Sequence, residues 1–130
     1  MSSIELPVER VATAIVDGCV HVHRTLGPGL LESVYQLCLA QELRDRGLKV
    51  ERELSYPVSY SSIVIATGFR IDMLIEDLVV VENKAVQTIL PVHQAQLLTY
   101  LKLTGRRVGF LINWNVPVIK EGIRRMVHQL

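Results

Sequence analysis

Hydrophobic residues recur at helical spacing in two stretches near the start of the chain. In residues 8–26 they lie three or four positions apart, and the step Gly27-Pro28-Gly29 that follows would stop a helix. A second stretch of this kind covers residues 30–46 and is followed by Gly47, which is a common residue just past a helix end. The pattern therefore predicts two consecutive helices.

The middle of the chain changes to the pattern of strands. Residues 48–58 read as a strand with a break near Pro57, and residues 59–62 have the composition of a turn. Residues 63–75 read as a second strand. Residues 78–86 are almost continuously apolar, which is typical of a central strand buried on both faces.

The last part of the chain predicts a helix, a strand and a final helix. Pro91 opens a helix that ends near Gly105, residues 107–114 read as a fourth strand, and residues 117–128 read as a helix. The expected order is ααβββαβα, an α/β (α+β) fold. The third strand, the helix after it and the fourth strand imply a right-handed crossover between parallel strands.

Composition indicates a folded protein but does not identify what it binds. With 130 residues, about half of them apolar, the chain suits one folded domain, and a net charge of +1 carries no strong nucleic-acid signal. Cys19 and Cys38 are isolated, so we expect free thiols in a reducing cytosol and a cytoplasmic protein. The N-terminus lacks the apolar stretch of a signal peptide, and no apolar run is long enough to span a membrane.

Three charged residues interrupt the apolar second and third strands. These are Asp72, Glu82 and Lys84. If the strands form a hairpin with a three-residue loop at 76–78, Asp72 lies opposite Glu82 and all three share one face. A two-residue loop would instead place Asp72 opposite Val81. Two carboxylates beside a lysine are what a divalent cation and an attacking water require.

An alternative interpretation is a salt-bridged patch on an exposed sheet face. The apolar run 78–81 argues against it, because it indicates a buried strand, and charge at the end of a buried strand is more often functional. Arg70 should share the face of Asp72, where it could pair with that carboxylate or contact a phosphate.

Polar residues also lie on the apolar faces of two expected helices. Glu32 falls at the margin of such a face, although a first-turn glutamate is also favoured by the helix dipole. His93, Gln96 and Tyr100 share one face of the later helix. A glutamine and a tyrosine one turn apart can orient a phosphate or a water, although an ordinary amphipathic helix has the same pattern.

Together these residues resemble a known pattern. Gly29, Glu32 and Tyr35 match the naming motif of the GxxExxY protein family, a branch of the PD-(D/E)xK nuclease superfamily. The resemblance runs from about Val8 to Val127. The stretches that carry it are His21–Arg24, Leu26–Tyr35, Gln96–Leu101 and Val108–Asn113.

The resemblance implies a restriction-endonuclease-like core, with a mixed four-stranded sheet flanked by helices, in a single domain over residues 1–130. It implies that Asp72 and Glu82 bind Mg²⁺ or Mn²⁺ together with the backbone carbonyl of Asn83, and that Lys84 is the catalytic lysine. Asn83 is polar where the family often has an apolar residue. The further catalytic residues expected are Gln96, Tyr100 and Glu32, and the expected substrate contacts are Arg70, Tyr35 and His93.

The function expected from these residues is metal-dependent hydrolysis of phosphodiester bonds, in DNA in preference to RNA. The alternative is a non-catalytic module on a nuclease fold that binds nucleic acid or protein. Because the chain offers little surface with which to grip DNA, a homodimer or another protein partner is also expected.

Overall fold

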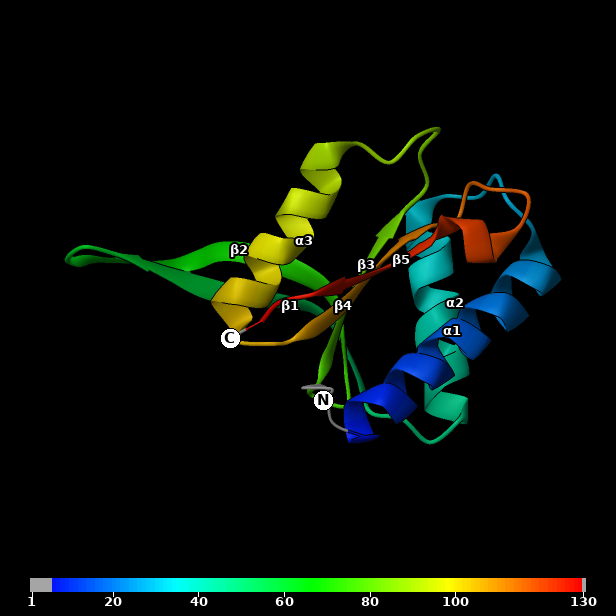
Figure 1. Ribbon diagram of the computed structural model, residues 1–130, viewed down its shortest axis with the longest axis horizontal. Coiled ribbons are helices and arrows are strands. Elements are labelled where there is room, and N and C mark those ends of the chain that lie inside the picture. The colour runs from blue at the N-terminus through cyan, green and yellow to red at the C-terminus, as the bar shows by residue number, and fades with distance from the viewer. Residues whose placement is uncertain (1–5, 130) are drawn as a thin grey trace.

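The computed structural model describes residues 6–129, so the expectation about a signal peptide concerns residues that lie partly outside this range. The elements, in chain order, are α1 (Leu6–Leu26), α2 (Glu32–Asp45), β1 (Val50–Tyr60), β2 (Ile63–Ile75), β3 (Val79–Lys84), α3 (Pro91–Thr104), β4 (Val108–Asn113), the 3-10 helix η1 (Ile119–Gly122) and β5 (Ile123–Val127). The five strands form one mixed sheet in the order β1-β2-β3-β4-β5, shown in Figure 1. The mixed α+β class is as expected.

The end of the chain differs from the sequence prediction. The helix expected over residues 117–128 is wrong: η1 and β5 occupy this segment, so the sheet has five strands instead of four. β5 pairs antiparallel with β4, whose six residues are all buried. The outer edge of so buried a strand needs hydrogen-bond partners, and β5 supplies them.

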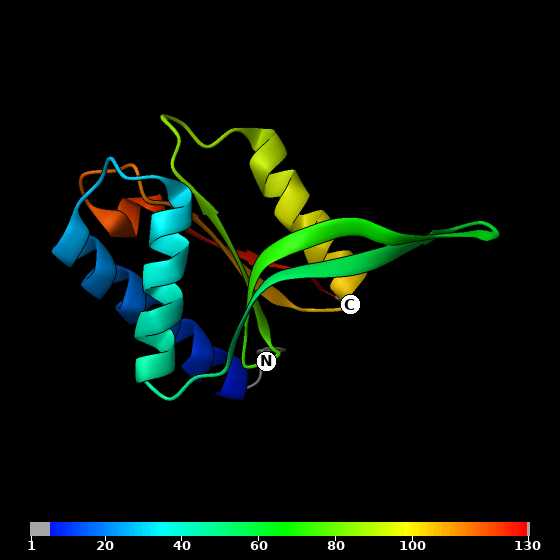
Figure 2. The ribbon, with the colours of Figure 1, turned by 180° about the vertical axis from the view of Figure 1, so that it is seen from behind.

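Helices cover both faces of the sheet (Figure 1, Figure 2). α1 and α2 pack on one face around a core that contains completely buried Ile15 and Leu39. α3 lies on the other face, where Leu97 and Leu101 pack over Val80. The predicted parallel pairing of the third and fourth strands is confirmed, because β3 and β4 are parallel neighbours joined through α3. The carboxyl ends of these two strands therefore lie at the same edge of the sheet.

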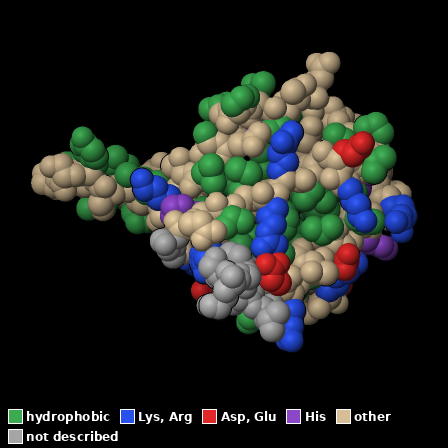
Figure 3. Space-filling view, viewed as in Figure 1, with side chains coloured by type: hydrophobic (Ala, Val, Ile, Leu, Met, Phe, Trp, Pro, Cys, Tyr) green, Lys and Arg blue, Asp and Glu red, His purple; other side chains and the backbone are tan. Residues whose placement is uncertain are grey.

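The β1–β2 hairpin projects well beyond the body of the molecule (Figure 2). Its register shifts between Tyr56 and Val58, at the predicted break near Pro57. A Cβ atom at Gly68 would overlap Val58, so this irregular pairing requires a glycine. Residues 55–69 contain no charged side chain, and Figure 3 shows hydrophobic side chains along the projecting part.

The base of this hairpin is tied to α3 by aromatic rings. Tyr56 stacks on Phe69 with centroids 5.4 Å apart, and Phe69 stacks on Tyr100 at 4.8 Å. This fixes the hairpin base against α3, near Asp72 of β2 and Glu82 of β3.

Two further expectations from the sequence, free cysteines and no membrane span, can be compared with the structure. Cys19 is buried and Cys38 partly buried, and both are free thiols; burial raises the pKa of the Cys19 thiol. Within residues 6–129, no helix has the length and apolar character needed to cross a membrane.

Candidate active site

The loop between β2 and β3 decides the register of the charged residues. Ile75 pairs with Val79 and Met73 with Val81, so the loop contains three residues, as predicted. Two of them, Glu76 and Asp77, have left-handed φ values of 53° and 59°, which close the tight turn. One step beyond the pair of Met73 with Val81, Asp72 and Glu82 come opposite each other.

At this point the carboxylates of Asp72 and Glu82 accept hydrogen bonds from backbone amides, in place of hydrogen bonds between the two strand backbones. Glu82 Oε2 accepts a hydrogen bond from the Asp72 amide at 2.8 Å. In return, Asp72 Oδ2 accepts one from the Asn83 amide, also at 2.8 Å. The side chains thus fill the place where the strands stop pairing, and each is held by the backbone of the other strand.

Among residues 6–129, the carboxylates of Asp72 and Glu82 are not neutralised by a neighbouring positive charge, and their pKa values are raised. Burial, and secondly the charge of Asp72, raises the pKa of Glu82 to about 8; burial likewise raises the pKa of Asp72. Lys84 acts in the opposite direction on both pKa values, but within the described part of the chain it forms no direct ion pair with either carboxylate. Glu82 is only 4% exposed, which disagrees with a solvated surface patch.

The donor set suits a hard cation. Two adjacent carboxylates need a counter-charge, and Mg²⁺ commonly takes one or two carboxylates and completes its shell with water. Among residues 6–129 no group of three or more His, Cys, Asp or Glu side chains is arranged as a metal cage. A cation here would therefore rely on Asp72, Glu82, backbone oxygen and water.

A pocket of about 270 Å³ opens beside these residues, and we call it the carboxylate pocket. Its lining residues are Glu32, Ser33, Gln36, Glu53, Arg70, Asp72, Asn83 and Lys84. Glu32 is the first residue of α2, so that helix begins at the pocket wall. The charge of Glu32 also raises the pKa of Asp72 slightly, and both residues line this pocket.

Glu53 is a member of this pocket that sequence reasoning missed. The pairing of β1 with β2 on either side of Glu53 places it opposite Asp72, and its φ of 54° is unusual within a strand. Arg70 pairs with Glu53 at 3.7 Å instead of with Asp72. The local sequence Glu51-Arg52-Glu53 reads as an ordinary polar strand, so nothing in it distinguished Glu53.

Tyr35 does not lie where a substrate contact was expected. It is completely buried, and its hydroxyl donates to the Gly27 carbonyl and accepts from the Leu30 amide at 3.1 Å. This corrects the expected role: Tyr35 anchors the loop that leads into α2. The reason is its position three residues into the helix, on the side packed against the core.

The side chain of Asn83 makes hydrogen bonds within the core. Its Oδ1 accepts from Trp114 Nε1 at 2.9 Å, and its Nδ2 donates to Met73 Sδ at 3.3 Å. Trp114 in turn stacks on Tyr35 with centroids 4.8 Å apart. Only the backbone of Asn83 is therefore available to the carboxylate pocket.

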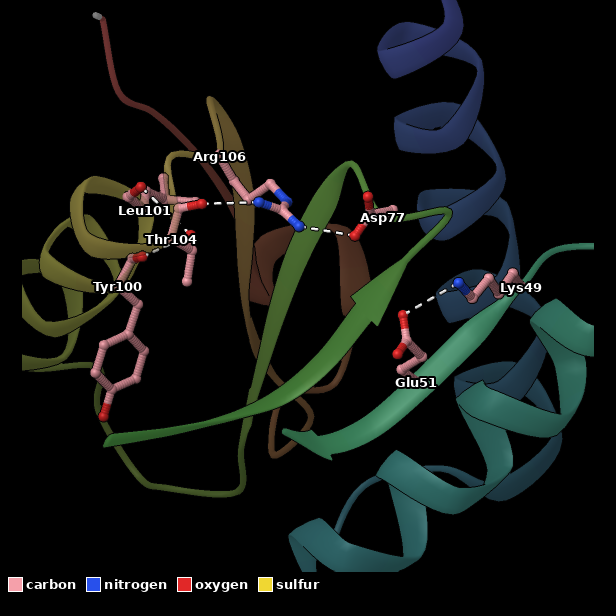
Figure 4. Close-up of polar contacts among 7 residues, drawn as sticks. All are labelled: Lys49, Glu51, Asp77, Tyr100, Leu101, Thr104 and Arg106. Carbon is pink, nitrogen blue, oxygen red and sulfur yellow. Dashed lines mark hydrogen bonds and ion pairs between the residues drawn. The ribbon is translucent and has the colours of Figure 1, made fainter. Parts of the chain in front are cut away.

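The three residues of α3 differ in their relation to the site. The pKa of Tyr100 is raised by partial burial and then by the charges of Glu82 and Asp72, so its phenol lies within their field. Figure 4 shows its ring extending away from the contacts at Thr104 and toward β2. Gln96, one turn earlier, is exposed.

His93 forms a capping hydrogen bond at the start of α3. Its Nδ1 accepts a hydrogen bond from the Leu90 amide at 3.0 Å, which caps the helix. His93 is not among the residues that line the carboxylate pocket, so its expected substrate contact stays a prediction.

Comparison with known proteins agrees with this geometry. The family model of the PD-(D/E)XK nuclease superfamily matches residues 9–126, and the chain belongs to this superfamily. The mixed sheet with helices on both faces is its restriction-endonuclease-like fold. Searches of curated proteins and of solved structures return no match.

Proposed function

We propose that this protein is a metal-dependent nuclease that hydrolyses phosphodiester bonds in DNA, with Mg²⁺ or Mn²⁺ bound at Asp72 and Glu82. One observation carries the proposal: the buried carboxylate of Glu82 and the half-buried carboxylate of Asp72 meet where β2 and β3 stop pairing, and Lys84 lies at the same strand end without a direct carboxylate partner in residues 6–129. A structural ion pair would have joined Lys84 to one of them. The motif Gly29, Glu32, Tyr35 supports membership of the GxxExxY branch.

The carboxylates and the Asn83 backbone oxygen would hold the cation. A divalent ion so held lowers the pKa of water and neutralises charge on the phosphate. The two carboxylates are fixed in advance by the amides of Asp72 and Asn83, so little reorganisation is needed when the ion binds.

Lys84 would orient the attacking water or stabilise the charge that develops on the phosphate. Arg70, on the wall of the carboxylate pocket, would contact a phosphate oxygen, and Glu53 would hold the guanidinium toward the pocket through their ion pair. Glu32, on the wall of the carboxylate pocket, would contribute a further carboxylate from α2 by contacting the cation through water.

Tyr100 and Gln96 complete the proposed set from α3. The phenol of Tyr100 lies in the field of the two carboxylates, where it would donate a hydrogen bond to a phosphate oxygen or to the water. Its stacking on Phe69 holds the ring in place.

The test is a cleavage assay with Mg²⁺ or Mn²⁺ on single-stranded, duplex, branched and supercoiled DNA and on RNA. Cleavage should occur for at least one DNA, stop with EDTA, and disappear in Glu82→Gln but not in Glu51→Gln, which alters an exposed pair with Lys49 (Figure 4). Absence of cleavage on every substrate, or equal cleavage by Glu82→Gln, would contradict the proposal. Nucleic-acid binding without cleavage would indicate a binding module instead.

A further inference from the structure

A second pocket adjoins the carboxylate pocket at the N-terminal end of α2. Its volume is about 320 Å³, and two of its residues, Glu32 and Ser33, also line the carboxylate pocket. We call it the leucine pocket, defined by Leu30, Leu31, Glu32, Ser33, Ala85 and Val86. The two pockets therefore lie next to each other at the start of α2.

Leu31 is an unusual residue for its position. It is the N-cap of α2 and makes no side-chain capping hydrogen bond. Ser, Thr, Asp or Asn would accept a bond from a free amide here, which is typically worth about 1 kcal/mol. Leu31 is also 74% exposed, so it stabilises neither the helix end nor the core. Violations of local rules of this kind are expected at functional positions.

The loop that carries Leu30 and Leu31 is held rigidly. Gly27 and Gly29 have left-handed φ values of 75° and 101°, which set the path of the loop. The buried hydroxyl of Tyr35 bonds both to the Gly27 carbonyl and to the Leu30 amide. The two leucines are therefore presented at the pocket in a fixed position.

The opposite wall is held in a comparable way. The side chain of Asn113 accepts from the Val86 amide at 3.1 Å and donates to the Val86 carbonyl at 2.9 Å. The two walls are also connected through the core, because Tyr35 stacks on Trp114 and Trp114 donates to Asn83. The leucine pocket is thus built on the same strand end as the carboxylates.

We propose that the leucine pocket holds the nucleobase next to the scissile phosphate, and that the preferred substrate is therefore single-stranded or unpaired at that nucleotide. This inference rests on the proposed function. The carboxylate pocket offers charged groups for the phosphate, and the adjoining leucines offer apolar surface for the flat face of a base. Glu32 and Ser33 lie where polar edges of the base can be recognised.

The size of the pocket favours one base over a base pair. At about 320 Å³ it lies at the small end of the roughly 300–1,000 Å³ range of ligand pockets. A base within a duplex would first have to leave its stack, which costs a few kcal/mol. A base in a single strand avoids most of this cost.

The test is a double-perturbation cycle, in which a protein substitution and a substrate modification are made separately and together. The value of kcat/KM is measured with Mg²⁺ for wild type and Leu31→Ala on single-stranded oligonucleotides, intact or with one abasic site placed in turn at each position. On the intact strand Leu31→Ala should lower kcat/KM on the order of five- to ten-fold, as expected for one lost apolar contact. An abasic site beside the cleavage point should lower the wild-type value similarly, and the combination should lower it no further.

Two further variants separate the contact from a general disturbance. Leu31→Met keeps an apolar side chain and should retain most of the activity. Leu37→Ala removes another leucine of α2, 52% exposed, that does not line the pocket, and should leave kcat/KM unchanged. The proposal is overturned if no abasic position affects wild type, or if Leu31→Ala lowers kcat/KM equally on intact and abasic strands. Failure of wild type to cleave any substrate would instead refute the proposed function, and this inference with it.

Discussion

Asp72 and Glu82 are joined through each other's strands: the carboxylate of Glu82 accepts the amide hydrogen of Asp72, and the carboxylate of Asp72 accepts that of Asn83. Two acidic side chains are thus fixed close together in a largely buried position. Such an arrangement is electrostatically unfavourable unless a cation binds or a proton is taken up.

One consequence is a pH-dependent stability of the metal-free protein. The pKa of Glu82 is raised from its ordinary 4.5 to about 8 on folding, so the folded protein binds the extra proton between these values. The free energy of unfolding in EDTA should therefore fall as pH rises from about 4.5 to 8, because the unfolded state binds fewer protons. Chemical denaturation across this range measures it. Glu82→Gln should lose much of the slope, and an identical slope in both proteins would contradict the argument.

Lys84 should matter for catalysis and little for stability. Since it makes no direct ion pair with a carboxylate in residues 6–129, Lys84→Ala should keep the wild-type melting temperature. Cleavage should fall by about 100-fold or more, as when other preorganised charge-stabilising groups are removed. Lys102→Ala, at an exposed position of α3, is the matched control. Wild-type cleavage by Lys84→Ala would refute this mechanism.

The Tyr35 hydroxyl should stabilise the loop into α2. Tyr35→Phe keeps the ring stacked on Trp114 but leaves the Leu30 amide without its partner, which should cost about 1–3 kcal/mol. Amide hydrogen exchange at Leu30 should become faster in this variant. Tyr60→Phe, at a tyrosine 75% exposed, should change neither quantity. Unchanged exchange at Leu30 in Tyr35→Phe would show that the hydroxyl does not hold the loop.

The Tyr100 hydroxyl should contribute to the reaction itself. Tyr100→Phe retains the ring that stacks on Phe69 and removes only the phenolic group. We expect kcat to fall on the order of ten-fold with an unchanged melting temperature. Tyr56→Phe makes the same change at the far end of the aromatic stack and should leave kcat unaltered. Equal effects of the two changes would mean that Tyr100 acts only in packing.

The sequence was sufficient to predict the central part of the fold. The apolar run 78–81 identified β3, and of the two loop lengths that the sequence left open, the structure has the three-residue loop that places Asp72 opposite Glu82. These predictions succeed because alternation along a strand and loop length are local properties of the chain.

Other features depend on contacts between distant segments. β5 was expected to be helical, but pairing with the buried strand β4 determines its conformation, as tertiary context often does for short segments. Arg125 of β5 pairs with Glu9 at 2.7 Å, across 116 residues of sequence. The place of Glu53 opposite Asp72 likewise follows from strand pairing and an unusual φ, which no local pattern indicates.

The most direct test of the central claim is a calorimetric titration of the protein with Mn²⁺ near pH 8. Wild type should bind one or two ions, and Asp72→Asn and Glu82→Gln should each abolish or greatly weaken this binding, while Glu51→Gln binds like wild type. Undiminished binding by the Asp72 and Glu82 variants, or no binding by wild type, would contradict the assignment of these two carboxylates as a metal site.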